Sequence, residues 1–270
     1  MDETTDLAHA RELARRAADE ERIAVAVSGD GMIGAIADEL RELPGAVVGI
    51  VPGGRGNDLA RVLGIPTDPL AAANVLLDGI ERAVDVGLVE PAVGPARAFV
   101  GIASAGFDSD ANRIANEAPA WLGGAVYAYG ALRALVAWRP ARLTALTDDE
   151  RFEFQGYSFA AASSRAYGGG MFVAPDALLD DGLLDIVCVA DGSKLRFLAN
   201  LPRVFSGTHV HEASVRVLRA RSVRLEADRD FVVYADGDPI GPLPATVTAL
   251  AGAITVICPP EVASAFGAAT

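Results

Sequence analysis

Two uninterrupted apolar runs, each followed by a glycine-rich turn and a helical pattern, most strongly constrain the fold of this chain. The first run covers residues 23–27 and leads into Ser-Gly-Asp-Gly at 28–31; the second covers 46–51 and leads into Pro-Gly-Gly-Arg-Gly at 52–56. A strand that is apolar throughout is buried on both faces, as in parallel sheets covered by helices. The N-terminal third is therefore predicted to be α/β, with both turns at the carboxyl edge of one sheet.

The pattern changes near residue 90. Beyond it, shorter stretches tend to alternate polar and apolar residues, which is typical of strands with one solvent-exposed face. Strands are predicted at 98–103, 152–162, 183–189, 213–218, 222–227, 231–234 and 253–258. Helices are predicted at 7–20, 32–43, 57–63, 109–138 and 192–204. We therefore expect an α/β domain over 1–90, a mainly antiparallel β-rich domain over 91–258 and a C-terminal tail over 259–270.

Charge and composition exclude several classes of protein. The 270 residues include 36 acidic and 23 basic side chains, a net charge of −13, so the average surface repels nucleic acid and we expect no nucleic-acid partner. The two cysteines, Cys188 and Cys258, lie in apolar runs and are expected to be reduced core residues. The acidic, polar N-terminus is unlike a signal peptide, so a cytoplasmic location is expected.

The first turn, residues 28–32, is a candidate phosphate site. Glycines let the backbone approach a phosphate, and a helix N-terminus favours negative charge. Asp30 would then act through a magnesium ion or its waters. The alternative is a tight turn in which Asp30 only caps the helix, and the tetrapeptide by itself does not separate the two.

The second turn, residues 52–58, is expected at the same edge of the sheet. Arg55 offers a planar fork for phosphate, whereas Asn57 or Asp58 could simply cap the following helix. Capping is favoured for either residue alone. Two glycine-rich turns with aspartates at one edge favour a nucleotide site.

Three further segments are ambiguous when each is taken alone. Residues 167–185 contain three glycines and the acidic turn Asp180-Asp181-Gly182, which suits either a cation site or a hairpin turn. Residues 234–239 (Tyr-Ala-Asp-Gly-Asp-Pro) also suit a hairpin turn. His209 and His211 would share one face of a strand at 208–211, but no third ligand is evident and metal binding is not expected there.

Taken together and in order, these segments resemble the diacylglycerol kinase catalytic domain in its bacterial lipid kinase branch, which includes sphingosine-kinase-like enzymes. The resemblance covers residues 5–260, and the stretches Pro-Gly-Gly-Arg-Gly-Asn-Asp and Leu-Asp-Asp-Gly-Leu-Leu-Asp are its most specific parts. NAD kinases share the Gly-Asp-Gly turn but lack the second loop. The resemblance rests on residues 27–31, 51–61, 104–108, 168–185 and 236–239.

The resemblance implies a two-domain, NAD kinase- and diacylglycerol kinase-like fold, with ATP, Mg²⁺ and a lipid meeting in the cleft between the domains. It implies that Asp30, Asp58, Asp181 and Asp238 converge on that cleft. Asp238 stands where the family places the general base, and Asp30 and Asp58 would share the catalytic edge. The nucleotide would be bound by Ser28, Gly29, Asp30, Gly31, Met32, Gly54, Arg55 and Asn57. A structural magnesium would be held by Asp181 and the carbonyls of Leu178 and Leu183.

The chain departs from the family pattern in three places. Ser28 and Met32 replace a glycine and a threonine, and Asp238 replaces a glutamate. The family also begins with a strand and an Asn-Pro-x-x-Gly loop, whereas this chain starts near the family's second strand. We therefore expect a parallel sheet that lacks its first strand unit and exposes an edge, which predicts low stability or a homo-oligomer.

The function predicted is transfer of the γ-phosphate of ATP to a membrane lipid, with diacylglycerol as the favoured acceptor. The alternatives are a non-catalytic relative that binds nucleotide or lipid, and a kinase of a soluble substrate of NAD kinase type. Residues 121–138 are predicted to lie in an apolar helix with tryptophans at both ends. This helix could contact a membrane surface peripherally or pack over the β-rich domain. Packing is favoured.

Overall fold

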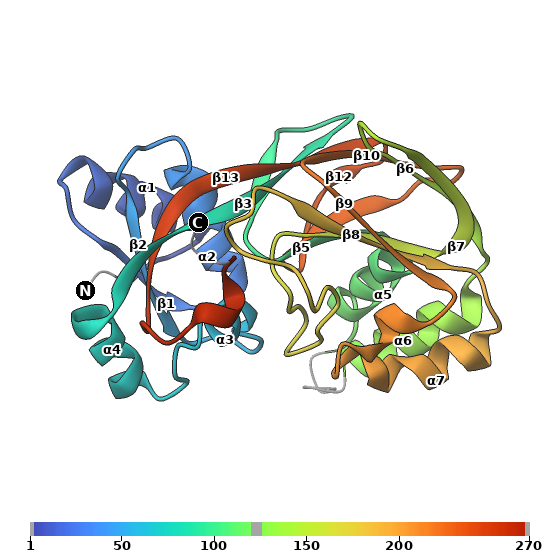
Figure 1. Cartoon of the computed structure of the whole chain (residues 1–270), viewed down its shortest axis with the longest axis horizontal. Coiled ribbons are helices and arrows are strands. Elements are labelled where there is room, and N and C mark those ends of the chain that lie inside the picture. Colours follow the sequence, from blue (N-terminus) through green and yellow to red (C-terminus); the bar gives the residue numbers. More distant parts are fainter. Residues whose placement is uncertain (1–2, 120–125, 268–270) are drawn as a thin grey trace.

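The computed structural model describes residues 3–119 and 126–267 and shows helices packed around an extended, curved sheet (Figure 1). In the N-terminal part, strands β1 (Ala24–Ser28) and β2 (Val47–Pro52) pair in parallel. Four helices surround them: α1 (Leu7–Asp19), α2 (Asp30–Leu40), α3 (Asp58–Val62) and α4 (Pro69–Asp78). The predicted parallel α/β arrangement is confirmed, whereas helix α4 was not foreseen.

The C-terminal part is mainly antiparallel, as predicted. Its shorter strands are β4 (Arg97–Phe99), β5 (Ile102–Gly106), β6 (Ala141–Leu146), β7 (Arg151–Ala162), β8 (Leu184–Ala190), β9 (Val215–Ala220), β10 (Ser222–Ala227), β11 (Val232–Ala235) and β12 (Asp238–Pro242). The predicted strand 98–103 is two strands, because the chain turns at Val100 and Gly101. Strands β6 and β12 were not foreseen.

The helices of the C-terminal part are α5 (Phe107–Asn116), α6 (Val126–Ala137) and α7 (Lys194–Val204). The prediction of one helix over 109–138 is wrong: α5 ends at Asn116, and α6 begins at Val126. Residues 120–125, including Trp121, lie outside the described residues. Trp138 is buried beside Phe107, Tyr157 and Phe231, so it packs on the β-rich part.

Two long strands, β3 (Ile80–Pro91) and β13 (Ala245–Cys258), join the two parts of the molecule (Figure 1). They pair antiparallel along almost their whole length. One end of β13 also pairs in parallel with β2, and its other end pairs antiparallel with β10. The described strands therefore form one continuous hydrogen-bonded network, and residue 90 falls inside β3.

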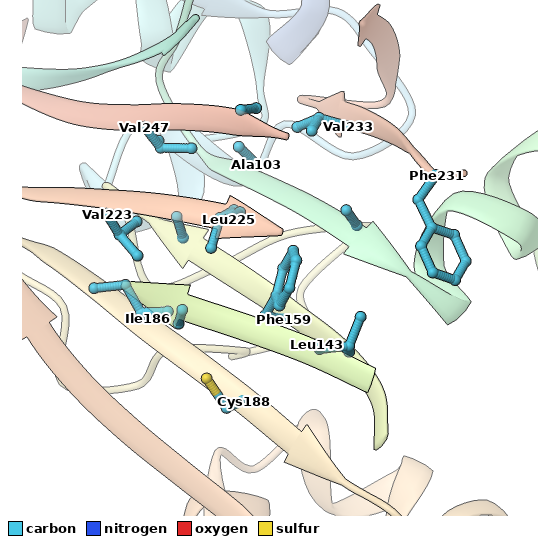
Figure 2. Close-up of a cluster of buried hydrophobic side chains, with 14 of the residues drawn as sticks. Ala103, Leu143, Phe159, Ile186, Cys188, Val223, Leu225, Phe231, Val233 and Val247 are labelled. Atoms are coloured by element: carbon cyan, nitrogen blue, oxygen red, sulfur yellow. The ribbon is translucent and has the colours of Figure 1, made fainter. Parts of the chain in front are cut away.

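Buried side chains form two main clusters, one in each part. The N-terminal cluster gathers residues of β1, β2, α2 and α3 and includes Phe266 from the segment after β13. Figure 2 shows the C-terminal cluster, where Leu143, Phe159 and Ile186 lie among other buried side chains that include Val223, Leu225 and Val247. Cys188 is in this second cluster and Cys258 in the first; both are buried free thiols, as expected.

Strand β1 lies at one end of the strand order and, among the described residues, pairs only with β2. Its outward side chains, Val25 and Val27, are exposed, as is Ile23 just before it. A half-exposed apolar edge is what a parallel sheet shows when no strand or helix covers it. The expectation of an uncovered sheet edge is thus confirmed.

Two smaller points complete the fold. His209 and His211 lie on a short 3₁₀ helix (Thr208–His211), so their prediction as a strand is wrong. The His209 ring is buried, with Nε2 3.0 Å from the Val173 carbonyl oxygen, and burial lowers its pKa. No helix within the described ranges is both long enough and apolar enough to span a bilayer.

Candidate active site

The two glycine-rich turns lie against each other, as their positions after β1 and β2 require. The Gly53 amide donates to the Ser28 carbonyl at 2.9 Å. A Cβ on Gly29 would stand 2.9 Å from the Gly54 Cα, so neither position has room for a side chain. Asn57, which has a φ of 53°, locks the second turn: its Oδ1 accepts from the Gly54 amide at 2.8 Å and its Nδ2 donates to the Gly54 carbonyl at 2.9 Å.

Asp30 begins α2 and binds the start of the next helix. Its carboxylate accepts hydrogen bonds from the backbone amides of Asp58 and Leu59, each at 3.0 Å. These amides belong to the first turn of α3, which has no intrahelical partner for them. The alternative in which Asp30 caps its own helix is wrong: Gly29 is the N-cap of α2, and the Asp30 carboxylate instead caps α3.

Asp58 continues this chain of contacts into the C-terminal part. Its carboxylate accepts from the amides of Gly169 at 2.8 Å and Gly170 at 2.7 Å. Burial raises the pKa of Asp58, an effect that the two amides oppose and the nearby Asp30 charge reinforces. A carboxylate from the second turn therefore holds the Tyr167–Met171 loop in place, and the sequence showed no sign of this pairing.

Asp236 supplies a third carboxylate held by backbone amides. It sits between β11 and β12 with a positive φ of 50° and accepts from the amides of Val100, Gly101 and Ile102 at 2.8–3.3 Å. Burial, together with the charge of Asp30, raises its pKa to about 7 despite those three amides. Sequence reasoning singled out Asp238 and missed Asp236, whose partners are more than 130 residues away.

These carboxylates border a polar cavity of about 690 Å³ between the two parts of the molecule. The predicted nucleotide residues that line it are Ser28, Gly29, Asp30, Gly31, Met32 and Arg55, and the predicted catalytic residue Asp58 lines it too. The remaining lining residues are Gly56, Leu59, Val100, Gly101, Asn112, Ala166, Tyr167, Gly168, Gly169, Asp236 and Gly237. Gly54 and Asn57 are not in the lining; they shape the turn behind it.

Asp238 begins β12 directly after Gly237, which lines this cavity, and is not itself one of the lining residues. Its Oδ2 lies 3.5 Å from where a Cβ on Gly31 would stand, so the carboxylate faces the first turn of α2. Although the residue is largely exposed, partial burial of its carboxylate raises the pKa of Asp238. Among the described residues no hydrogen bond or ion pair engages this carboxylate, in contrast to Asp30, Asp58 and Asp236. Its carboxylate is therefore available to accept a proton.

A second cavity, of about 430 Å³, is mostly apolar and lies under α5 and α7. Phe107, Tyr157, Val187 and Phe197 contribute to its walls, and it also contains Asp108, whose pKa burial raises to about 6. Asn112, Tyr167 and Gly168 line this cavity and the polar one alike. The Asn112 Nδ2 donates to the Tyr167 hydroxyl at 3.2 Å, so this pair marks the junction of the two cavities.

The acidic turn Asp180-Asp181-Gly182 is not part of either cavity lining. Asp181 lines neither cavity, so the expectation that it joins Asp30, Asp58 and Asp238 at one cleft is wrong. Its carboxylate accepts from the Leu183 amide at 3.0 Å and forms an ion pair with Arg219. The Leu183 backbone is thus turned toward Asp181 through its N–H group.

The predicted magnesium set of Leu178, Asp181 and Leu183 does not fit a divalent cation in this arrangement, because the Arg219 guanidinium already occupies the Asp181 carboxylate. No group of three or more His, Cys, Asp or Glu side chains suited to a metal occurs in the described part of the chain. The neighbouring Asp85 carboxylate, which sequence reasoning did not select, is also engaged, accepting from the amides of Gly182 at 2.6 Å and Gly252 at 2.8 Å.

The chain matches two family descriptions. Residues 1–89 match "Diacylglycerol kinase catalytic domain", and residues 101–258 match "YegS C-terminal NAD kinase beta sandwich-like domain". A diacylglycerol kinase of Mycobacterium tuberculosis is 36% identical over 239 residues, which is 87% of this chain and 77% of that protein. The chain belongs to the diacylglycerol kinase family.

Further relatives agree with this membership. A diacylglycerol kinase of Bacillus subtilis is 27% identical and covers 88% of this chain and 78% of its own length. A Pseudomonas aeruginosa protein named "Probable lipid kinase YegS-like" is 31% identical over 80% of this chain and 70% of its own length. The solved structure of a candidate diacylglycerol kinase from Bacillus anthracis has the same fold, with a TM-score of 0.77, 22% identity and coverage of 96% and 85% of the two chains.

Members of this family are ATP-dependent lipid kinases, and the prediction of that class of enzyme is confirmed. The relatives above are named for lipids, which gives no support to the alternatives of an NAD kinase type of enzyme or a non-catalytic relative. The predicted combination of an α/β part with a β-rich, NAD kinase-like part is confirmed as well.

Proposed function

We propose that this lipid kinase phosphorylates the free hydroxyl of diacylglycerol, with ATP in the polar cavity and the acyl chains in the apolar one. The observation that carries the proposal is that the two cavities share Asn112, Tyr167 and Gly168. A diacylglycerol molecule has two greasy chains and one small hydroxyl. Apolar walls suit the chains, and a polar junction suits the hydroxyl that must reach the γ-phosphate.

In this proposal the glycine-rich turns bind the ATP phosphates. Residues 29–32 at the start of α2 line the cavity, where a helix N-terminus favours anionic groups, and Arg55 offers a charged fork. The bare backbone at Gly29 and Gly54 keeps the two turns in contact. The Mg²⁺ that accompanies ATP would neutralise part of the phosphate charge.

Asp30 and Asp58 then act as positioning residues. Each has its carboxylate bound to two backbone amides and holds the segments that carry those amides. Together they fix α3 and the Tyr167–Met171 loop relative to the first turn. Phosphoryl transfer depends mainly on alignment and charge stabilisation, so a rigid frame of this kind contributes directly to the rate.

Asp238 is proposed as the general base. It would accept the proton of the lipid hydroxyl as the hydroxyl oxygen attacks the γ-phosphorus and ADP leaves. Asp236 itself lines the polar cavity, but its carboxylate oxygens already accept from three backbone amides. The unengaged carboxylate of Asp238 is the better acceptor for a proton.

The test is ADP release with Mg-ATP and, separately, diacylglycerol, sphingosine or NAD presented in detergent micelles. We expect turnover with diacylglycerol, and a loss of about 10²–10⁴-fold in kcat for Asp238→Asn, the range typical of a lost general base. The matched control is Asp148→Asn, which changes an exposed aspartate in the turn between β6 and β7 and should leave turnover unchanged.

Each other outcome counts against a defined part of the proposal. Turnover with sphingosine and none with diacylglycerol would refute the acceptor. Turnover with NAD alone would refute the lipid site. Full activity of Asp238→Asn would refute the base.

A further inference from the structure

Among the described residues, Asn112 is the only helical side chain that lines both cavities. It lies on α5 with Asp108 and Ala111, and spacings of three and four residues place all three on one face of that helix. The three line the apolar cavity together, but only Asn112 continues into the lining of the polar one. Its side-chain amide therefore stands where lipid and nucleotide would meet.

The Asn112 amide keeps hydrogen-bonding capacity after its contact within the protein. Its Nδ2 donates to the Tyr167 hydroxyl at 3.2 Å, and no other hydrogen bond engages this side chain in the part of the chain that the structure describes. A side-chain amide has two N–H donors and one acceptor oxygen. The bond to Tyr167 uses one donor, so the second N–H remains for a ligand.

The other side chains that can donate into the apolar cavity do not reach the junction. They line the apolar cavity and are not in the lining of the polar one: Tyr157, Ser158, Arg196, Asn200, His209 and Ser214. Asp108, when ionised, can only accept. A side-chain donor for a polar group held at the junction therefore comes from Asn112 or from its partner Tyr167.

The proposed acceptor brings a group that needs such a donor. In a 1,2-diacylglycerol the free hydroxyl is on carbon 3 of glycerol and one ester is on the neighbouring carbon 2, so this ester stays within a few bonds of the oxygen that is phosphorylated. An ester carbonyl can only accept, and a carbonyl that leaves water without finding a donor is destabilising. The ester on carbon 2 therefore requires a donor near the junction.

We propose that the second N–H of Asn112 donates to the carbonyl oxygen of the ester on glycerol carbon 2, which makes Asn112 a specificity-determining residue for the lipid. The contact fixes the glycerol unit, so that the neighbouring hydroxyl is directed into the polar cavity. This deepens the proposed function, on which it rests for the placement of the acyl chains in the apolar cavity. The enzyme thereby selects a lipid with an ester beside the carbon that carries the hydroxyl.

The test compares two isomeric lipids, 1-O-octyl-2-octanoylglycerol and 1-octanoyl-2-O-octylglycerol, which differ only in which chain is linked through the ester. Binding of each to the full chain is measured by isothermal titration calorimetry without nucleotide. We expect the isomer with the ester on carbon 2 to bind about 3–10-fold more tightly, the range of one neutral hydrogen bond. In Asn112→Asp, which has the same shape but no N–H donor, the ratio should fall to about one.

Three further variants separate the ester contact from a structural role of Asn112. Asn112→Leu has no polar atom and should also lose the preference between the isomers. Tyr167→Phe removes the partner of Asn112 within the protein but leaves its amide, and Asn200→Leu changes an asparagine that lines the apolar cavity alone. Both should keep the preference. Thermal melting establishes that each variant is folded.

Equal binding of the two isomers to the unaltered chain, or binding of neither, would overturn the proposal without any variant. So would a preference that persists in Asn112→Asp and Asn112→Leu, or one that is lost in Tyr167→Phe and Asn200→Leu. ADP release tests the proposed function separately. A preference in binding with no turnover of either lipid would refute the proposed kinase reaction and leave the ester contact standing.

Discussion

Two buried aspartates, Asp58 in the candidate active site and Asp185 beside the acidic turn, show how different partners give one residue type different roles. They are 6% and 3% exposed, and burial raises the pKa of both, that of Asp185 to about 6. Asp58 is held by the neutral amides of Gly169 and Gly170, and Asp185 by the guanidinium of Arg219 at 3.4 Å.

The difference matters for the surroundings of each group. A carboxylate held by amides fixes the backbone that donates to it, which suits a frame around a phosphate-binding turn. A carboxylate beside a guanidinium is neutralised, which leaves no charge for a metal ion. The same residue type therefore belongs to a positioning network in one place and to an internal ion pair in the other.

The largest effect on stability is expected from Asp58→Ala. The amides of Gly169 and Gly170 would lose their acceptor, and the free energy of unfolding should fall by about 2–4 kcal/mol, the cost of leaving such groups unpaired. Displacement of the loop should also lower kcat by about 10²-fold. Chemical denaturation and ADP release measure the two quantities.

Asp58→Asn serves as the control for this variant. Its amide oxygen can still accept from one of the two glycines, so its loss of stability should be clearly smaller. If Asp58→Ala keeps normal kcat, the positioning role is incorrect.

A smaller effect concerns pH and Asp236, another amide-held carboxylate. Its pKa is about 7 in the folded protein against an ordinary 3.8, so the folded state binds the extra proton between those values. The contribution of this group is therefore fully favourable below pH 3.8 and is lost as pH rises toward about 7. We expect Asp236→Asn to remove that part of the slope of unfolding free energy against pH. An unchanged slope would show that Asp236 does not titrate there.

Arg219→Gln should act on stability more weakly and on catalysis hardly at all. Arg219 is about half exposed, so solvent screening limits the pair with Asp181 and Asp185, and we expect a loss of about 1 kcal/mol. Thermal melting gives the stability, and ADP release should show a kcat close to that of the unaltered chain. A large fall in kcat would mean that the acidic turn supports the active site after all.

The smallest effect is expected from metal removal without nucleotide. Because Arg219 already neutralises Asp181, the melting temperature should be the same in EDTA and in millimolar Mg²⁺. Marked stabilisation by Mg²⁺ would restore the predicted site at Leu178, Asp181 and Leu183.

Much of the fold was predictable because local pattern determines it. The strand predicted at 222–227 has those bounds in the structure, and both parallel strands begin and end within a residue of prediction. The long strands β3 and β13 were harder, since their lengths follow from pairing with each other across 150 residues of sequence and not from local alternation. The bulge between Leu250 and Ile254 further interrupts the pattern in β13.

The residues of the candidate site likewise fall into those that local sequence identified and those that it did not. Residues adjacent in sequence, such as those at 28–32, were identified from the turn that they form. The partners of Asp58 and Asp236, and the Asn112–Tyr167 pair, were not, because each joins segments more than 50 residues apart. Arg219 was missed for the same reason: an arginine on a strand carries no sign that it will face an acidic turn.

The most direct test of the shared junction between the two cavities is a crystal structure with a non-hydrolysable ATP analogue and a short-chain diacylglycerol. We predict phosphates against residues 28–32, acyl chains beside Phe107 and Phe197, and the free hydroxyl near Asp238 and Tyr167. Nucleotide bound away from the first turn, or lipid bound outside the apolar cavity, would contradict it.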